Sequence, residues 1–478
     1  MKQLCAGASR IRITPGTAPV QDPLYIKALV LVSEEKTAAI LSLDYICMGG
    51  GIGELSDAFF EKLKQRTGAM GVGSLICGTT HTHTPGSMFV DDETVLARAC
   101  EAIEAARSAA EPVRIGFGQG EDSSFLINRT LTLKDGSAWT IRQAHPCPPD
   151  DQIKAVEPAD PTVELLRVDR MDGAPLCVLF TFGCHPLLGY ASNKVTANYP
   201  GIAERIVEEQ TGAVAMMLQS CGGDVTEISY KDYDTPKCCD EPGMTLGLAV
   251  LKALKTIKTK DVPGFDFVRQ EAEFPRRNDI PAVRERLLLE REELLESLSN
   301  CPLNFKAFLP LYMKYLISPE YPLDYAYAYL WEEAKGSTQL QDQDRINRKN
   351  LKKYLDNLQT MEKLSKLTDT LQTLKWHESY NAASGEDTIS GEVAGLRLGE
   401  RILLTAPVEP LSAIGRRVKA LSPDAMLIGY ANGYMHYGAP AEAYNNGGYE
   451  TIECMLGAGW QAVYEAAVLS VLQKLEKC

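Results

Sequence analysis

Histidine is scarce in this chain, which carries six histidines among 478 residues. Two of them, His81 and His83, form a His-Thr-His pair after the apolar run 74–77. Alternate residues of a strand point to one face, so a strand here would turn both imidazoles into one cavity, and Pro85 and Gly86 would then end it. Imidazole is a common zinc ligand. The spacing indicates part of a metal-dependent hydrolytic centre, with an ordinary polar strand as the alternative.

Two residues far along the chain could complete such a centre, because a hydrolytic zinc site usually has three protein ligands and an exchangeable water. His185 follows the apolar run 177–182, and sites of α/β folds lie at strand ends. A hydrogen-bonded core histidine is the alternative there. Glu409 stands between Pro407-Val and Pro410 after a strand-like run, and could supply a carboxylate. A glutamate at the rim of a cavity is the alternative.

The elements that must position these residues alternate in type up to about residue 260. Apolar runs at 28–32, 38–43, 74–77 and 215–218 predict strands. Amphipathic stretches at 54–66, 93–110 and 203–210 predict helices. Strand-like runs return at 392–398, 401–406 and 425–431, before a last helix at 459–477. We therefore predict an α/β fold, with mixed β-sheets layered with helices, in a single catalytic domain spanning residues 1–478.

The character of the chain changes between about 278 and 376. Pro281 opens a Glu-, Arg- and Leu-rich helical stretch that extends to Leu298, and residues 345–376 predict a further helix. Between them, segment 305–331 is rich in Phe, Tyr and Trp. We predict a helical insertion at 278–376 whose aromatic face packs on the main body. A lid or an apolar substrate channel is the alternative.

Composition excludes several function classes. The net charge of -14 repels phosphate backbones, so we expect no nucleic-acid partner. No uncharged run is long enough for a transmembrane segment. Arg10 and Arg12 lie where a secretory signal needs its apolar core, so we expect a cytoplasmic protein. The thirteen cysteines are irregularly spaced, which is typical of reduced, buried thiols. The sequence does not indicate an oligomeric state.

Two other patterns are less informative. The run Gly49-Gly-Gly-Ile-Gly follows a strand but lacks both the dinucleotide-binding spacing and the Lys-Ser/Thr of a phosphate loop, so we interpret it as a flexible loop. Cys221 precedes two glycines and could be imagined as a nucleophile paired with a histidine. A buried structural cysteine is the better interpretation.

Taken together, the motifs resemble the neutral/alkaline, non-lysosomal ceramidase family, as a divergent bacterial-type member. They occur in the family's order over nearly the whole chain: Arg12-Ile-Thr-Pro-Gly, Thr80-His-Thr-His-Thr-Pro-Gly, Asn128-Arg-Thr, Asp160-Pro-Thr-Val-Glu-Leu-Leu-Arg-Val, His185, Gln219-Ser-Cys-Gly-Gly-Asp-Val-Thr, Ala406-Pro-Val-Glu and Asn432-Gly-Tyr-Met-His-Tyr.

The resemblance implies a site with one Zn²⁺ per chain. The family's zinc ligands fall on His81, His185, Glu409 and Tyr437, the last being the second tyrosine of an Asn-x-Tyr-x-x-Tyr segment. The second histidine of the pair, His83, is implied to contact the substrate instead.

Two further residues are implied to act on the substrate. The arginine of the family's Asn-Arg-Ser segment corresponds to Arg129, and an active-site tyrosine in a Tyr-Glu pair falls on Tyr449. Both are hydrogen-bond donors that could stabilise an oxyanion, while His83 could position the substrate or carry a proton to the leaving amine.

The sequence also departs from the family pattern. Thr84-Pro85-Gly86 is shorter than the family's Ser-Gly-Pro-Gly, Pro-Leu-Leu-Gly replaces Gly-Thr-Ser after His185, Asn198 stands at an acidic position, and 439–444 is a degraded Thr-Pro-Glu-Glu-Tyr block. No C-terminal immunoglobulin-like domain is expected. These changes touch substrate contacts more than metal ligands.

The expected function is therefore zinc-dependent hydrolysis of the amide bond of an N-acyl substrate, ceramide or a ceramide-like lipid amide, by a zinc-activated water. Two alternatives stay open. One is a different metal-dependent amidohydrolase acting on a non-lipid amide. The other is a non-catalytic binding protein that retains the fold.

Overall fold

The chain divides into two compact units. The computed structural model describes residues 3–477 except 15, 17, 35, 53–54, 84–90, 142–147 and 232–235. Unit 1 comprises Met1–Asn278 and Ser384–Cys478, and unit 2 comprises Asp279–Ala383. Every candidate site residue named above belongs to unit 1.

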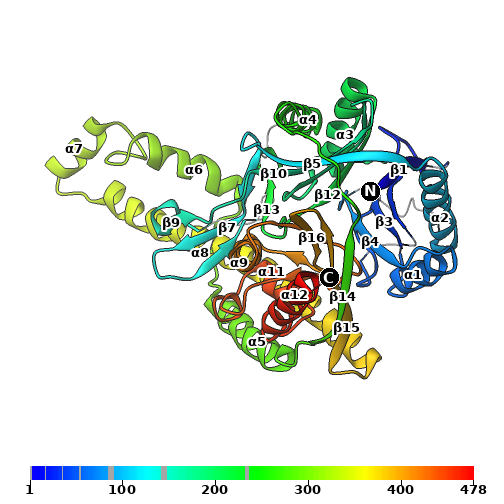
Figure 1. Ribbon diagram of the computed structural model, residues 1–478. Coiled ribbons are helices and arrows are strands. Elements are labelled where there is room, and N and C mark those ends of the chain that lie inside the picture. The colour runs from blue at the N-terminus through cyan, green and yellow to red at the C-terminus, as the bar shows by residue number, and fades with distance from the viewer. Residues whose placement is uncertain are drawn as a thin grey trace. The chain divides into compact units, whose positions relative to one another are not determined.

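Unit 1 contains two large sheets (Figure 1). The eight-stranded sheet is antiparallel except for two parallel pairs, β3 with β4 and β11 with β12. Its strands lie in the order β12 (Val214–Gln219), β11 (Pro175–Phe182), β10 (Thr162–Arg170), β5 (Glu111–Glu121), β1 (Cys5–Arg12), β2 (Tyr25–Ser33), β3 (Lys36–Leu43) and β4 (Ser74–Thr79). The four-stranded sheet has the order β14 (Asp266–Pro275), β15 (Thr388–Leu398), β16 (Arg401–Thr405) and β18 (Ala425–Ile428).

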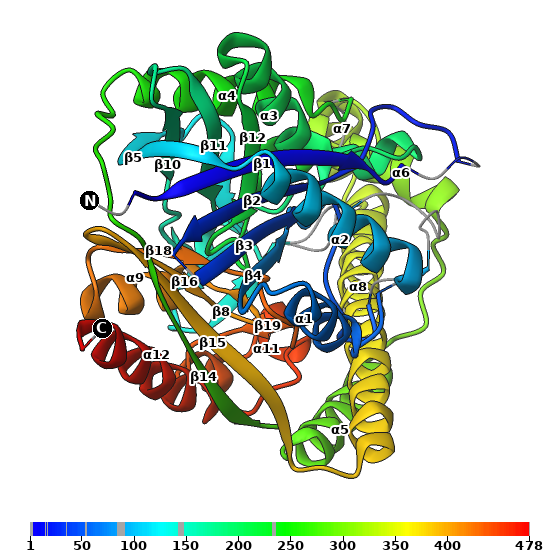
Figure 2. The same cartoon turned by 45° about the vertical axis from the view of Figure 1, so that its right-hand side comes forward.

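The two sheets are the inner layers of a four-layered unit, with helices outside (Figures 1 and 2). Along β2, Ala28 and Val30 pack with the outer helices, whereas Leu29 and Leu31 pack with residues of the four-stranded sheet. Both faces of the strand are therefore buried, and the sequence is apolar almost without interruption. The outer helices are α1 (Phe59–Ala69), α2 (Asp92–Ser108), α3 (Asn198–Thr211) and α4 (Asp240–Leu254) on the larger sheet, and α9 (Ser412–Leu421) and α12 (Trp460–Glu476) on the smaller one.

The eight-stranded sheet curls until its two edges approach each other. The Ser42 hydroxyl on β3 donates to the carbonyl of Met217 on β12. Gly78 on β4 lies so near β12 that a Cβ there would be 2.7 Å from the Leu218 side chain. Because the parallel strands β4, β11 and β12 end in this region, the segments that follow them meet.

Short elements complete unit 1 around those strand ends. Glu409 and Tyr437 are direct register partners of a two-residue parallel pair, β17 (Glu409–Pro410) and β19 (Tyr437–Gly438). The others are β6 (Leu126–Asn128), β7 (Thr130–Leu133), β8 (Ala138–Thr140), β9 (Ile153–Val156), β13 (Val225–Glu227), α10 (Ala443–Asn446), α11 (Tyr449–Ile452) and the 3-10 turns Asp150–Gln152, Leu188–Ser192 and Ile228–Tyr230.

The predicted α/β fold of layered helices and mixed sheets is confirmed. One local prediction is wrong. The apolar run 74–77 does not continue as a strand through the histidine pair, because β4 ends at Thr79 and His81 has a left-handed backbone with φ of 60°. The expected strand break at Pro85 and Gly86 lies outside the described residues.

Unit 2 is built from four helices: α5 (Ile280–Ser297), α6 (Phe305–Ile317), α7 (Ala326–Ala334) and α8 (Gln339–Ser384). Pro281 lies in the first turn of α5, as predicted. Helix α8 is longer than the predicted 345–376. One face of α6 packs on it, with the Phe308 and Tyr354 rings stacked 4.3 Å apart. In the described part of the chain, no helix combines the length and apolar character needed to cross a bilayer.

Candidate metal centre

His81 and His185 each follow a strand end and face each other across the centre. Their ring centroids are 4.8 Å apart. Nδ1 of His81 lies 2.7 Å from the carbonyl oxygen of Ile46, and Nδ1 of His185 lies 2.6 Å from that of Gly222. A carbonyl can only accept, so each Nδ1 carries the proton and donates it. Each Nε2 is therefore left with a lone pair directed into the centre, which is the tautomer that a metal-ligating histidine needs.

Glu409 joins the two imidazoles. Its Oε2 lies 3.1 Å from Nε2 of His185 and 3.6 Å from Nε2 of His81. The Tyr434 hydroxyl donates to the other carboxylate oxygen, and the Tyr430 hydroxyl lies 3.4 Å from Oε2. Burial opposes ionisation, but the histidines and Tyr434 hold the pKa of Glu409 below its usual range. Burial lowers the pKa of His81 to about 4, so this imidazole is neutral at pH 7.

Tyr437 enters the centre beside Glu409 because the two residues are strand partners. Its hydroxyl lies 3.4 Å from Nε2 of His185 and accepts a hydrogen bond of 2.9 Å from Nη2 of Arg129. Burial raises the pKa of this phenol well above 10, and the neighbouring guanidinium acts in the opposite direction. A phenol oxygen next to a fixed cation can ionise more readily when a second positive charge binds.

These donors fit a zinc ion. Ligand nitrogens of His81, His83 and His185 all lie within 4.8 Å of one another. The nitrogens, the Glu409 carboxylate and the Tyr437 phenol oxygen are donor types that zinc accepts, and the Nδ1 hydrogen bonds supply the outer support typical of zinc-bound histidine. The structure thus contains a candidate metal-binding group. The assignment of individual ligands stays a prediction.

His83 reaches the same centre without the expected strand geometry. Its half-buried ring meets that of His81 edge to face at 4.7 Å, and the two Nε2 atoms are 3.1 Å apart. The left-handed turn at His81, rather than the alternation of side chains along a strand, therefore brings the two imidazoles together. Burial, together with His81 and His185, lowers the pKa of His83 well below 6.5.

Arg129 and Tyr449 lie next to Tyr437. The Arg129 guanidinium carbon lies 5.4 Å from the Tyr437 ring centre and 5.2 Å from that of Tyr449. Nε of Arg129 donates to Glu450 at 2.7 Å, and Nη2 also donates to the carbonyl of Gly223 at 2.7 Å. Among the described residues no hydrogen bond reaches Nη1, so that group keeps free donors. All seven predicted site residues thus lie in one connected cluster.

Sequence reasoning missed the residues that hold this cluster. Nε2 of Gln219 donates to the carbonyls of Thr80 at 2.9 Å and Cys184 at 3.0 Å, and these residues directly precede the two metal-side histidines. The motif 219–226 contains Gln219, but a side chain that binds backbone carbonyls leaves no signal in the sequence. Glu227 accepts the backbone N–H groups of Leu187 and Leu188, just after His185. Burial raises its pKa to about 8.

Two sequence patterns acquire a structural explanation. Gly50, in the run interpreted as a flexible loop, has φ of 73°, and a Cβ there would lie 2.5 Å from the Tyr434 ring. Its carbonyl also accepts from Nε2 of His436, so the loop packs on the segment that carries Tyr434. Cys221 is buried, and desolvation raises the pKa of its thiol to about 12, which removes the thiolate that a nucleophile needs.

Comparison with solved structures places the fold among the ceramidases. The crystal structure of neutral ceramidase from Pseudomonas aeruginosa is similar to this chain with a TM-score of 0.61 and 15% sequence identity, over 100% of this chain and 75% of that chain. A ceramidase complexed with C2 gives the same TM-score and identity, over 99% of this chain and 76% of that chain. No protein-family model matches the sequence. No curated protein matches it either. At this identity the likeness establishes a ceramidase-like fold, and the activity must be argued from the site.

Proposed function

We propose that this protein is a zinc-dependent hydrolase that cleaves the amide bond of an N-acyl substrate, ceramide or a ceramide-like lipid amide. The observation that carries the proposal is the convergence of two Nε2 lone pairs with a buried carboxylate and a phenol. Each of the two imidazoles has its Nδ1 fixed by a backbone carbonyl. The ceramidase-like fold supports the reaction class.

In this proposal His81, His185, Glu409 and Tyr437 hold one Zn²⁺ per chain. Zinc, when bound, supplies Lewis-acid chemistry that lowers the pKa of water and polarises an amide carbonyl. The residues themselves prepare the site for such an ion. Glu409 provides a negative charge between the imidazoles, and Arg129 favours ionisation of Tyr437.

His83 is the proposed proton carrier. Its lowered pKa keeps the imidazole neutral at neutral pH, and we assign to it the transfer of a proton from the attacking water to the leaving amine.

Arg129 and Tyr449 are the proposed donors to the oxyanion of the tetrahedral state. The bonds from Arg129 to Glu450 and Gly223 fix the guanidinium and leave Nη1 to donate. Donors that are already oriented stabilise developing charge without reorganising, which makes such groups effective in a buried site.

The substrate class rests on the fold likeness together with the sequence motifs. The segment after His185 differs from the family pattern, and Leu187 and Leu188 here replace polar residues of that pattern. Both leucines are buried, and Leu188 packs within the hydrophobic core of unit 1, so the hydrocarbon tail is argued from the fold likeness and the motifs alone. On that basis we propose an acylated amine with a hydrocarbon tail. The cytoplasmic location also stays a prediction.

The test combines metal analysis with a substrate panel. The purified full chain should contain about one zinc per molecule and, at saturating zinc, should hydrolyse N-acyl amides with a rate that rises with acyl length from acetyl to palmitoyl, ceramide included. Zinc-loaded protein that hydrolyses no N-acyl amide would contradict the enzymatic assignment. Equal rates across chain lengths would remove the lipid assignment and favour an amidohydrolase for non-lipid amides.

A further inference from the structure

Helix α6 of unit 2 carries apolar residues on a buried face and on an exposed face. Phe308 and Tyr315 belong to the face that packs on α8. The other face repeats at intervals of three or four residues and is open to solvent; its members are Phe305, Leu309, Met313, Leu316 and Ile317, with exposed fractions of 65%, 44%, 45%, 58% and 78%. A surface helix ordinarily carries polar residues on its solvent side. A continuous exposed apolar face of this kind marks an interaction surface.

Helix α7 presents a second exposed face of a particular composition. Tyr327, Leu330 and Trp331 share one side of the helix, and Trp331 is 60% exposed. The Tyr325 and Tyr327 rings are stacked 5.8 Å apart, and Nζ of Lys335 lies 3.8 Å from the Trp331 ring centre. Rings that are apolar at one end and polar at the other, with lysines beside them, are typical of the boundary between lipid and water.

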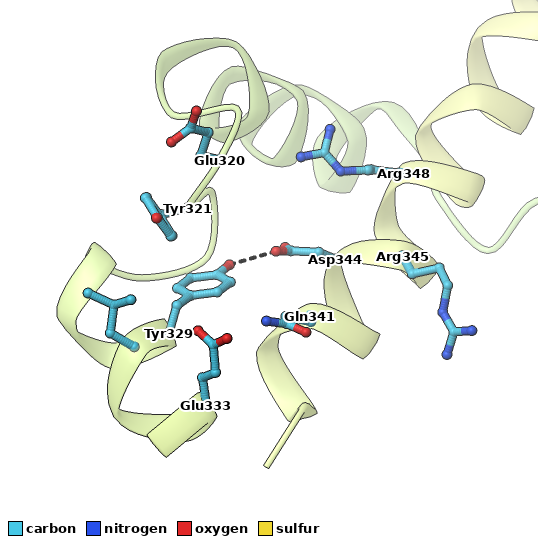
Figure 3. Close-up of a pocket in the computed structure, with 9 residues that line it drawn as sticks. Glu320, Tyr321, Tyr329, Glu333, Gln341, Asp344, Arg345 and Arg348 are labelled. Carbon is cyan, nitrogen blue, oxygen red and sulfur yellow. Dashed lines mark hydrogen bonds between the residues drawn. The ribbon is translucent and has the colours of Figure 1, made fainter. Parts of the chain in front are cut away.

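The same unit contains a pocket of about 420 Å³ next to α7. Figure 3 shows the Tyr329 hydroxyl pointing toward Asp344 at the pocket wall. The hydroxyls of Tyr315 and Tyr329 both donate to the Asp344 carboxylate at 2.7 Å, which satisfies this buried acid. Leu330 lines the pocket and is also part of the exposed face of α7, so pocket and face are continuous.

The pocket separates opposite charges. On one side, Glu320 and Glu333 accompany the rings of Tyr321 and Tyr329, whose centroids are 5.2 Å apart (Figure 3). Among the described residues, neither glutamate forms an ion pair. Carboxylates beside aromatic faces attract an ammonium or a quaternary ammonium group.

The other side of the pocket is basic. Arg345 and Arg348 belong to α8; Arg345 is paired with Asp342 and its guanidinium points away from the rings in Figure 3, whereas the guanidinium of Arg348 points toward their side of the pocket. Arg348 donates one bond to the carbonyl of Pro319 and lies over the Tyr315 ring at 4.9 Å, which fixes its direction and leaves further N–H groups to donate. Guanidinium groups match a phosphate in both charge and geometry.

We propose that unit 2 docks on a lipid surface whose headgroups are zwitterionic phosphodiesters of the phosphocholine type. The exposed faces of α6 and α7 enter the apolar boundary, and one headgroup occupies the pocket with its ammonium toward Glu320 and its phosphate toward Arg348. Charge complementarity selects this occupant over a second copy of the chain, since a protein interface would deplete lysine and would not require paired opposite charges in one pocket. The inference rests on the proposed function, because a water-insoluble N-acyl amide lies within such a surface.

The test measures co-sedimentation of the full-length, zinc-loaded protein with phosphatidylcholine vesicles and with phosphatidylglycerol vesicles. We expect binding to the first and at least about fivefold weaker binding to the second, because the net charge of the protein opposes an anionic surface. The double variant Leu309→Ser/Trp331→Ser should lose about tenfold or more in binding to phosphatidylcholine. Leu289→Ser is the matched control, since Leu289 is 58% exposed on α5 outside these faces, and it should bind as the wild type does.

Headgroup recognition is tested by Glu320→Gln and Arg348→Gln. Each should reduce binding to phosphatidylcholine several-fold, and free phosphocholine at millimolar concentration should compete with the vesicles. Equal binding to both vesicle types, or unchanged binding of both pocket variants, would overturn headgroup selection. A wild-type dimer in light scattering that Trp331→Ser converts to a monomer, without vesicle binding, would show that a second copy covers the face and would overturn the proposal.

Hydrolysis of a water-soluble N-acetyl or N-butanoyl amide separates the two claims. The unit 2 variants should hydrolyse it at the wild-type rate. Normal hydrolysis without vesicle binding overturns the docking proposal alone. Vesicle binding without hydrolysis of any amide instead contradicts the proposed function.

Discussion

The centre of unit 1 buries polar side chains, whereas the exposed faces of unit 2 leave apolar side chains in solvent. Both arrangements depart from the usual distribution of side chains. Unit 1 buries His81, His185 and Glu409 almost completely, whereas unit 2 leaves Ile317 and Trp331 largely in solvent. Buried polar groups cost free energy unless they are paired, and exposed apolar groups forgo the free energy of burial. Both regions therefore sacrifice stability. In each unit, the region to which we assign a function is the one that departs from the burial rule.

The two units also differ in how many residues have a positive φ angle. His81, Asn198, Tyr430, Asn432 and His436 all have positive φ in or beside the centre of unit 1. Among the described residues of unit 2, positive φ occurs at Gly336 alone. Non-glycine residues in this region cost about 1 kcal/mol or more each, so the centre is held in place by its surroundings.

The largest effect is expected from the predicted metal ligands. His81→Asn and Glu409→Gln should each reduce bound zinc from about one per chain to near zero and should lower kcat/KM about 10³-fold or more. Asparagine tolerates the left-handed backbone of position 81, so folding should survive. Metal analysis with circular dichroism checks both points. A variant that keeps stoichiometric zinc would remove its residue from the ligand set.

His83→Ala tests whether the histidine pair is divided in function. We expect zinc to stay near one per chain while kcat falls about 10²- to 10³-fold, because proton transfer is lost and metal binding is not. Parallel zinc titration and steady-state kinetics measure the two quantities. Loss of zinc together with activity would instead make His83 a third histidine ligand, as its 3.1 Å distance from His81 allows.

Substitution of one glycine in each unit compares how tightly the two units are packed around a residue with positive φ. Gly50→Ala and Gly336→Ala both place Ala at φ near 70°, but a Cβ at Gly50 meets the Tyr434 ring at 2.5 Å and one at Gly336 meets nothing within 4 Å. We expect a loss of about 1 kcal/mol in unfolding free energy for Gly336→Ala and about 3 kcal/mol for Gly50→Ala. Urea unfolding measures both. Zinc affinity should weaken in the Gly50 variant only, and equal losses would show that the Gly50 loop is not tightly packed.

Gln219→Met removes the clamp between the histidine segments while nearly keeping its volume. The carbonyls of Thr80 and Cys184 lose a shared donor, so His81 and His185 are held less firmly. We expect zinc affinity to fall about 10- to 100-fold, as for other second-layer partners of metal ligands, with residual activity at saturating zinc. Competition with a chelator measures the affinity. An unchanged affinity would exclude a positioning role.

The smallest effect is expected in the pH dependence of stability. Glu227 titrates near 4.3 when unfolded and at about 8 when folded, so the folded state holds its proton more tightly. Its contribution to stability is complete below about pH 4 and is lost as pH rises toward 8. Glu227→Gln should remove part of this decline, at most about 1.4 kcal/mol per pH unit. Urea unfolding at pH 5 to 8 tests it, and parallel wild-type and variant profiles would contradict it.

The fold was largely predictable because its strands are buried on both faces and read as uninterrupted apolar runs. The local backbone conformation that brings the site residues together was not predictable. His81 and His83 were correctly paired in space for the wrong reason, since a left-handed turn rather than a strand brings the rings together. Such a turn leaves no periodic signal in the sequence.

The partners of the predicted site residues were equally hidden. Gln219 acts through carbonyl groups, which every residue carries, so its role depends on tertiary structure alone. Tyr434 is the exception, because it is the first tyrosine of the Asn-x-Tyr-x-x-Tyr segment that ends at Tyr437 and so carries a sequence signal. Its hydrogen bond to Glu409 follows from the pairing of β17 with β19. Strands of two residues are too short to be recognised from the sequence, so this pairing could not be predicted.

That pairing also sets the time at which the centre is complete during biosynthesis. The ribosome delivers His81 and His185 long before Glu409, and the register partner Tyr437 follows later still. A partly synthesised chain therefore presents imidazoles without their carboxylate or phenol. If these four residues bind zinc as proposed, tight capture of the ion is confined to chains that have been translated past β19. Metal content would then report completed synthesis of this protein as well as correct folding.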